Sequence, residues 1–191
     1  MYTLIPENQL IPQKGRLLLA EPYIDDPFFK KSVIYLCEHS EEGSFGFVLN
    51  NYIDFDFDRV GQEFPSLNTK VSIGGPVQNS NLFFLHTLAH EVRQSMELGQ
   101  GIFMGGDFDH LQQLVREDKV AKTDVRFFVG YSGWSPNQLE EEIKSNSWIV
   151  APCYLDLLMN TSIDDLWTAV LKKMGKNYAR LAELPKDPSL N

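Results

Sequence analysis

Residues 125–150 constrain the fold more than any other stretch of the sequence. Apolar and other side chains alternate over 125–129, which predicts a strand that is buried on at least one face. The segment 130–134, with the sequence GYSGW, predicts a turn, and the run WIV at 148–150 predicts a second strand. We therefore expect a strand, a turn, a helix and a strand in close succession.

The helix between these two strands has the clearest start signal in the chain. Ser135 is a good N-cap, Pro136 follows at the first helical position, and Gln138 lies three residues after the cap. This is the pattern of a capping box, with proline where a backbone N–H is not needed. The start of such a helix presents free N–H groups beside Ser132 and Trp134, and these groups can bind an anion or a carboxylate.

Three interpretations of Gly130–Trp134 remain open. The segment resembles a nucleophile elbow, in which a serine sits on a sharp strand-to-helix turn, although Trp134 stands where that motif has glycine. It can also be a ligand-binding corner without catalysis. The third interpretation is purely structural: the glycines permit positive φ in a tight turn, and Trp134 fills the core.

The charge balance excludes several classes of partner. The chain has 191 residues and a mass of 21.8 kDa, which fits one domain, and its formal net charge is −9. Because it has no basic stripe to neutralise phosphates, we expect no direct nucleic-acid binding and no attraction to an anionic membrane. Cys37 and Cys153 are distant in sequence and predict reduced thiols. We expect no secretory signal and a cytoplasmic protein.

Outside the central stretch, turn residues divide the chain into short elements. Asp107 is a good N-cap for one helix, and Ser162 with Asp165 caps a final helix. Residues 52–70 are interpreted as an acidic linker with a short helix near 60–63. Further strands are predicted over 15–20, 32–37, 45–49, 71–73, 82–88 and 102–104.

The number and order of these elements predict the fold class. About seven or eight strands and three helices alternate irregularly, which is not a βαβ pattern. We therefore predict a single α+β domain with a mostly antiparallel, strongly curved sheet and about three flanking helices. The domain spans residues 15–180, with an N-terminal arm over 1–14 and a loose C-terminal tail over 181–191.

A set of residues in a fixed order runs through most of the chain. Its members are Gly15, Leu17–Ala20, Pro22, Asp26, Pro27, Phe29, Ser32, Val33, His39, Gly43, Gly46, Asn50, Gly74, Gly75, Pro76, Val77, Leu85, His86, Gly106, Asp107, Gly130–Trp134, Gln138–Glu140, Glu142 and Trp148. No single piece is diagnostic, but together they resemble the AlgH/YqgE family of bacterial proteins.

The resemblance implies a compact fold whose sheet bends into a pseudo-barrel. It implies no established activity, because the family is described as a transcriptional regulator without a known biochemical function. The chain departs from the family pattern at Asn51 and Tyr52, where a basic residue and proline are usual. At Ser132 the family more often has alanine, which has no hydroxyl to activate, and this weakens a nucleophile role.

The histidines and cysteines do not predict a metal or cofactor site. Cys37 and His39 lack the spacing of zinc ligands, so His39 is interpreted as a loop histidine and His86 as a satisfied strand histidine. Asp107 is interpreted as an N-cap rather than a catalytic acid. We predict no bound metal and no cofactor.

The first functional hypothesis is a non-enzymatic binding or regulatory protein that acts indirectly, without DNA contact, on an unknown small molecule or protein partner. Its candidate site consists of polar, glycine and aromatic residues at strand ends, namely Asn50, Gly74, Gly75, Pro76, Asp107, Gly130, Ser132, Gly133 and Trp134. The alternative is a hydrolase that uses Ser132 with His39 or His86 as base. A third possibility is a scaffold that acts in an oligomer through the acidic and aromatic segment 54–58.

Overall fold

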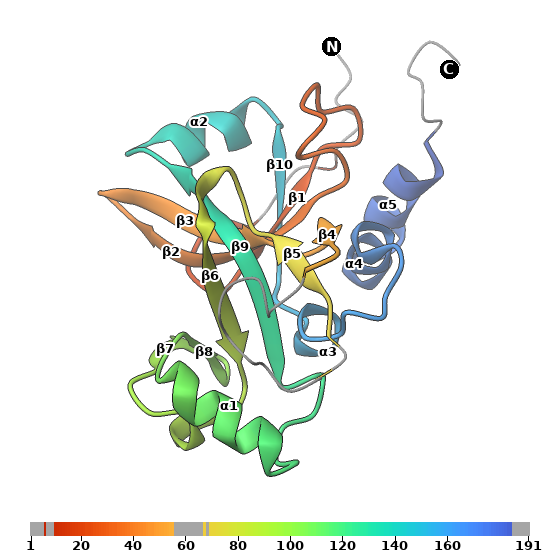
Figure 1. Ribbon diagram of the computed structural model, residues 1–191. Helices are drawn as coiled ribbons and strands as arrows, with labels where there is room; N and C mark the ends of the chain where they lie inside the picture. The colour runs from red at the N-terminus through yellow and green to blue at the C-terminus, as the bar shows by residue number, and fades with distance from the viewer. Residues whose placement is uncertain (1–5, 7–9, 56–66, 68, 185–191) are drawn as a thin grey trace.

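The structure is a computed structural model that describes residues 6, 10–55, 67 and 69–184 (Figure 1). Within these residues, ten strands form one sheet. The strands are β1 (Leu17–Ala20), β2 (Val33–Ser40), β3 (Gly43–Val48), β4 (Tyr52–Ile53), β5 (Val71–Ile73), β6 (Val77–His86), β7 (Met96–Gly99), β8 (Ile102–Met104), β9 (Val125–Trp134) and β10 (Trp148–Ala151). The helices are α1 (Phe108–Arg116), α2 (Gln138–Lys144), α3 (Leu155–Leu158), α4 (Leu166–Met174) and α5 (Lys176–Ala179), with 3-10 turns η2 (Ala89–Glu91) and η3 (Arg180–Glu183).

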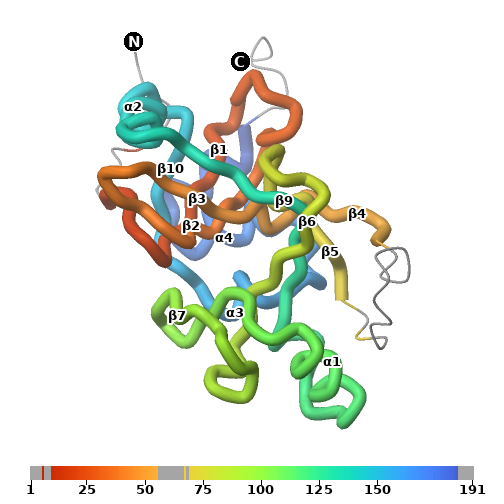
Figure 2. Tube along the Cα trace, turned by 60° about the vertical axis from the view of Figure 1, so that its left-hand side comes forward, coloured from red at the N-terminus to blue at the C-terminus, as the bar shows by residue number. Residues whose placement is uncertain are grey.

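The sheet is open. Its strand order is β10-β1-β2-β3-β9-β6-β8-β7, with β4 and β5 attached beside β9, and β5 with β9 is the parallel pair among the described strands. The terminal strands β10 and β7 do not pair and lie toward opposite ends of the molecule (Figures 1 and 2). The α+β domain and the mostly antiparallel sheet are therefore confirmed. The strong curvature and the pseudo-barrel are wrong, because helices rather than closure of the sheet cover its faces.

β9 is the strand on which two parts of the sheet meet. β6 pairs along one edge, from Val125 to Tyr131, while β5 and β3 share the other edge. To pass from β5 to β6, the segment 74–76 crosses over β9. A Cβ atom added at Gly75 would lie 2.0 Å from the carbonyl carbon of Tyr131, and one at Gly130 would lie 2.6 Å from the Gly75 carbonyl oxygen. Only glycine fits such a crossing, and Gly130 also has a φ of 69°.

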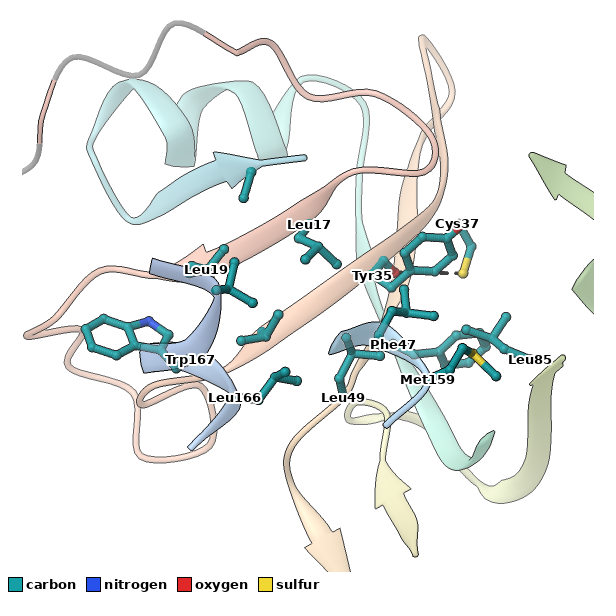
Figure 3. Packing of buried hydrophobic residues seen from close by; sticks show 14 of the residues in the cluster. Leu17, Leu19, Tyr35, Cys37, Phe47, Leu49, Leu85, Met159, Leu166 and Trp167 are labelled. Carbon is teal, nitrogen blue, oxygen red and sulfur yellow. Dashed lines mark hydrogen bonds between the residues drawn. The ribbon is translucent and has the colours of Figure 1, made fainter. Parts of the chain in front are cut away.

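Three hydrophobic clusters hold the helices on the sheet. Because side chains alternate along a strand, Leu17 and Leu19 of β1 face the α4 side, where they share a cluster with Trp167 (Figure 3). Leu18 faces the opposite side and shares a cluster with Leu139 of α2. α1 covers a third cluster on β6 and β9. Two helical layers thus enclose the β1–β2–β10 part of the sheet.

Local signals predict the helix starts at both aspartates. Asp107 accepts a hydrogen bond from the His110 N–H at 3.0 Å, which confirms it as the N-cap of α1. Asp165 accepts from the Thr168 N–H at 3.0 Å, so it, rather than Ser162, is the N-cap of α4. These bonds satisfy N–H groups that have no partner within the helix.

Some elements were too short for the sequence pattern to show. β4, β7, α3 and α5 have 2, 4, 4 and 4 residues, so the helical period is covered about once and the strand alternation at most twice, which is too little to identify them. η3 places Leu181 in the core, so packed structure continues past residue 180. The predicted helix near 60–63 and residues 56–58 of the acidic segment lie outside the described residues. In the described part of the chain, no helix is long and apolar enough to cross a membrane.

The strand crossing gives a first prediction. Gly75→Ala should lower the free energy of unfolding by more than about 3 kcal/mol, because its Cβ cannot be accommodated without moving the backbone of β9. Gly133→Ala, in β9, is the matched control. Its Cβ would meet Tyr131 Cε2 at 3.5 Å, an ordinary contact, so stability should change by less than about 1 kcal/mol. Equal stability of the two variants in urea unfolding would contradict the crossing.

Candidate functional site

β9 ends at Trp134 between two pockets. Successive side chains of a strand point to opposite faces, so Ser132 and Trp134 face one way and Tyr131 the other. The pocket on the Trp134 side, which we call the indole pocket, has a volume of about 330 Å³. Its lining residues come from separate segments of the chain and are Ile24, Asp26, Phe29, Pro76, Ser132, Gly133, Trp134, Gln138, Glu142, Ser147 and Trp148.

Glu142 fixes the rings of the indole pocket. Its Oε2 accepts hydrogen bonds from Nε1–H of Trp134 at 2.8 Å and of Trp148 at 2.7 Å, and its Oε1 accepts from Gln138 Nε2 at 2.9 Å. The two indole rings meet edge to face with centroids 6.0 Å apart, and Phe29 packs on Trp148 at 5.5 Å. Three neutral donors therefore satisfy one carboxylate and orient an aromatic cluster around it.

The helix α2, which carries Gln138 and Glu142, starts later than predicted. It begins at Gln138 after Asn137, whose φ is 64°, so Ser135 is not the N-cap and Pro136 is not the first helical residue. Gln138 Oε1 nevertheless accepts from the Ser135 N–H at 3.0 Å, which is one half of the predicted capping box. The later start follows from the greater length of β9, which uses residues 132–134 for pairing with β3.

The structure brings part of the predicted site together. The members that line the indole pocket are Pro76, Ser132, Gly133 and Trp134. The members that form the backbone crossing are Gly74, Gly75 and Gly130.

Asn50 and Asp107 serve local structure instead. The Asn50 side chain accepts from the Val33 N–H at 2.9 Å and donates to the Lys31 carbonyl oxygen at 2.8 Å, so it holds the start of β2. Asp107 caps α1. Neither side chain lines the indole pocket.

Ser132 does not have the geometry of a nucleophile elbow. β9 continues through Ser132 to Trp134 as a strand, where the sequence predicted a turn. The Ser132 hydroxyl donates to the Gly74 carbonyl oxygen at 3.0 Å, and the residue is only 2% exposed. This bond ties the crossing segment to β9 and leaves the hydroxyl turned away from solvent.

His39 lies in strand β2, and not in the predicted loop. Its Nδ1 is 2.7 Å from the Ser44 hydroxyl, and its Nε2 is 3.6 Å from a carboxylate oxygen of Glu140. Its nearest hydroxyl partner is thus Ser44 rather than Ser132. Within the described residues, His, Cys, Asp and Glu side chains do not gather in a group of three or more that could hold a metal ion.

His86 is buried in β6. Its Nε2 contacts the Gly105 carbonyl oxygen at 3.1 Å and the Ser95 hydroxyl at 2.9 Å. Because a carbonyl only accepts, Nε2 carries the proton, and Nδ1 is an acceptor that has no hydrogen-bond partner. Burial lowers the pKa of His86 below its usual value of 6.5, although the bond to Gly105 opposes this shift.

A larger pocket lies on the Tyr131 side of β9, and we call it the aromatic pocket. Its volume is about 680 Å³. Gly133 and Trp134 line it as well as the indole pocket. Its other lining residues are Glu38, Ser40, Glu42, Gly43, Ser44, Phe45, Phe47, Val77, Phe83, Met104, Tyr131, Ser135 and Pro136.

The sequence interpretation missed the partners of Trp134 in the indole pocket. A buried tryptophan usually needs an acceptor for its indole N–H, and Glu142 lies eight residues after Trp134 on the adjoining helix. The need for an acceptor of the Trp134 indole N–H could therefore have indicated Glu142 from the sequence. The approach of Phe29 and Trp148 depends on contacts between distant segments, and no local pattern indicates it.

These features define a class of protein: a small α+β domain with one open, mostly antiparallel sheet and two pockets at the end of its central strand. A sequence profile of the AlgH-like family matches residues 17–179. The chain is 36% identical over 188 residues to the UPF0301 protein of Bacteroides fragilis, covering 98% of this chain and 95% of the relative. It is 37% identical over 179 residues to the UPF0301 protein of Cytophaga hutchinsonii, covering 93% and 98%.

Solved structures agree with this assignment. The solution structure of the AlgH protein from Pseudomonas aeruginosa matches with a TM-score of 0.71 and 26% identity, covering 97% of this chain and 98% of that one. A crystal structure of a protein from Corynebacterium diphtheriae matches with a TM-score of 0.74 and 25% identity, covering 90% and 92%. The chain therefore belongs to the AlgH-like family, which confirms the resemblance drawn from its sequence.

The Glu142 cluster gives a second prediction. Glu142→Ala removes the acceptor of two buried indole N–H groups, so the free energy of unfolding should fall by about 2 to 4 kcal/mol. The control is Glu141→Ala, which removes an exposed partner of Lys144 on the same helix and should leave stability near that of the wild type. Urea unfolding measures both, and NMR should show two shifted indole N–H signals in Glu142→Ala alone. An unshifted pair of signals would contradict the shared acceptor.

His86 gives a third prediction, for stability as a function of pH. The unfolded chain binds a proton at this histidine near pH 6.5, whereas the folded chain resists it, so the free energy of unfolding should fall as the pH drops below about 6.5. The slope from this group is at most about 1.4 kcal/mol per pH unit. His86→Gln should remove this part of the slope, and above pH 7 the difference between the two proteins should be constant. Parallel curves from pH 7.5 to 5.5 would show that His86 keeps an ordinary pKa.

Proposed function

We propose that this protein is a non-enzymatic binding or regulatory protein that acts indirectly, without DNA contact, and that its ligand site is the indole pocket. One observation carries the proposal: residues from five stretches of the chain, 24–29, 76, 132–134, 138–142 and 147–148, line one pocket, and Glu142 binds both of its indoles. Except for Ile24 and Ser147, every lining residue belongs to the set by which the sequence resembles its family.

The chemistry of the pocket suits a small molecule that is partly flat and apolar. Phe29, Trp134 and Trp148 offer ring edges and faces, while Asp26 and Gln138 are exposed polar groups beside them. A volume of about 330 Å³ is at the lower end of the range of about 300–1,000 Å³ that is usual for ligand pockets. The ligand is therefore expected to be of metabolite size, held by rings and oriented by a few hydrogen bonds.

Charge supports the exclusion of direct DNA contact. The formal net charge is −9, and the indole pocket presents the carboxylates of Asp26 and Glu142. A protein that binds DNA must neutralise several phosphates with lysine or arginine. A regulatory effect of this protein would thus reach transcription through a ligand or a protein partner.

The hydrolase alternative has weaker support. A serine nucleophile needs an adjacent base and access to substrate. The Ser132 hydroxyl is buried and donates to a backbone carbonyl, while His39 and His86 contact Ser44 and Ser95 instead. The geometry therefore favours a binding role for this corner over a catalytic one.

A thermal-shift screen against metabolites and nucleotides tests the binding role. A ligand at 100 times its Kd should stabilise the protein by about 2.7 kcal/mol, and the shift should be lost in Trp148→Phe, which removes an indole N–H inside the indole pocket and does not line the aromatic pocket. Trp167→Phe is the matched control, because it also loses an indole hydrogen bond, to the Ala20 carbonyl oxygen, but lies outside the pocket. A hit that persists in Trp148→Phe would place the ligand elsewhere, and a screen without any saturable hit would contradict a small-molecule ligand.

A further inference from the structure

The aromatic pocket has walls built from rings on neighbouring strands. Phe45 of β3 and Tyr131 of β9 meet at 5.8 Å with an interplanar angle of 73°, and Phe83 of β6 meets Tyr131 at 5.9 Å and 89°. Phe47 lies 5.6 Å from Phe83. Tyr131 is thus shared between two edge-to-face pairs, and the rings of Phe45, Phe83 and Tyr131 form one continuous aromatic wall with Phe47 behind it.

These rings are open to a ligand rather than fully enclosed in the core. Phe45, Phe83 and Tyr131 are half-buried, whereas Phe47 is fully buried beneath them. Lysine or arginine side chains lie over other rings, such as Lys173 over Tyr154 at 5.0 Å. In the described part of the chain, no such cation–aromatic pair uses a ring of the aromatic pocket.

The charge of the pocket has one sign. Glu38 and Glu42, from the hairpin between β2 and β3, both line it, and Glu42 is exposed. Among the described lining residues there is no lysine, arginine or histidine to neutralise them. A negative ligand would be repelled there, while a cation would gain from both carboxylates and from the ring faces, which carry negative partial charge.

From this geometry we propose that the aromatic pocket is a second binding site, and that it takes a small organic cation, an alkylated ammonium carried on an apolar or aromatic group. The apolar part packs against Phe45, Phe83 and Met104, and the ammonium lies near Tyr131 and the hairpin carboxylates. A volume of about 680 Å³ accommodates a molecule of this kind. The aromatic pocket shares Gly133 and Trp134 with the indole pocket, but the residues proposed to hold the cation line the aromatic pocket alone.

The test uses a matched pair of probes. One is a benzyl alcohol with a para-trimethylammonium group, and the other is its neutral isostere with a para-tert-butyl group. Calorimetric titration should show the cation binding about tenfold more tightly than the isostere, with the difference shrinking as salt is added. Because the two probes have the same shape and differ in charge, the difference between their affinities gives the electrostatic contribution to binding.

Four variants place the site. Tyr131→Leu removes the shared ring and should weaken binding of the cation about tenfold, whereas Tyr154→Leu removes a half-buried tyrosine outside the pocket and should not. Glu42→Gln should reduce the preference for the cation several-fold, and Glu141→Gln, a change of equal charge on α2, should not.

Each result decides the proposal. Tighter binding of the cation that is lost in Tyr131→Leu supports it. Equal binding of the two probes would overturn the cationic specificity while leaving an apolar site, and binding that survives Tyr131→Leu would show that the cation binds elsewhere. Absence of binding by both probes at millimolar concentration would overturn the site itself. None of these outcomes depends on the thermal-shift screen of the indole pocket.

Discussion

The rest of the structure depends on how closely one backbone segment crosses another. Gly74 and Gly75 pass over β9 at a distance that leaves no room for a Cβ atom, and three hydrogen bonds hold Gly74 there. Gly74 O accepts from the Ser132 hydroxyl at 3.0 Å and from the Val48 N–H at 2.9 Å, and the Gly74 N–H donates to the Val129 carbonyl oxygen at 2.9 Å. The crossing thus joins β3, β5, β6 and β9 at one point. Because packed backbones cannot shift independently, the directions of the side chains that leave β9 are fixed as well.

A second constraint acts at the other end of the strand. The Arg126 guanidinium is almost fully buried and donates to the carbonyl oxygens of Leu49 and Leu158 and to the Tyr52 hydroxyl. Its partners are neutral, so burial lowers the pKa of this arginine. A buried charge is tolerated only when its hydrogen bonds are satisfied, so these bonds link β9, the end of β3 and α3 in one arrangement. β9 is therefore fixed by Arg126 near its first residue and by the backbone crossing near its last residues, where the two pockets lie.

Features that a few adjacent residues decide could be predicted from the sequence, whereas features that depend on contacts between distant segments could not. The caps at Asp107 and Asp165 were found because a helix start is decided by a few adjacent residues. The end of β9 was placed too early, because GYSGW has the composition of a turn, yet pairing with β3 keeps it extended. Propensity is overruled here by a partner strand more than 80 residues away, as the pair Phe45 and Gly133 shows. Gly130 does have the positive φ that the sequence interpretation expected, but it permits a crossing rather than a tight turn.

The same difference between local and long-range contacts explains why only some of the predicted site residues line a pocket. Ser132 and Trp134 were chosen for their place beside a helix start, and they do line a pocket, while Asn50 and Asp107 are used for hydrogen bonds that hold nearby backbone. Glu142 supports the proposed binding role of the site over a catalytic one. Its oxygens already accept from two indoles and an amide, so it orients rings and has no free role as a base. Preorganised rings and satisfied polar groups around this pocket support the proposed site for a small ligand.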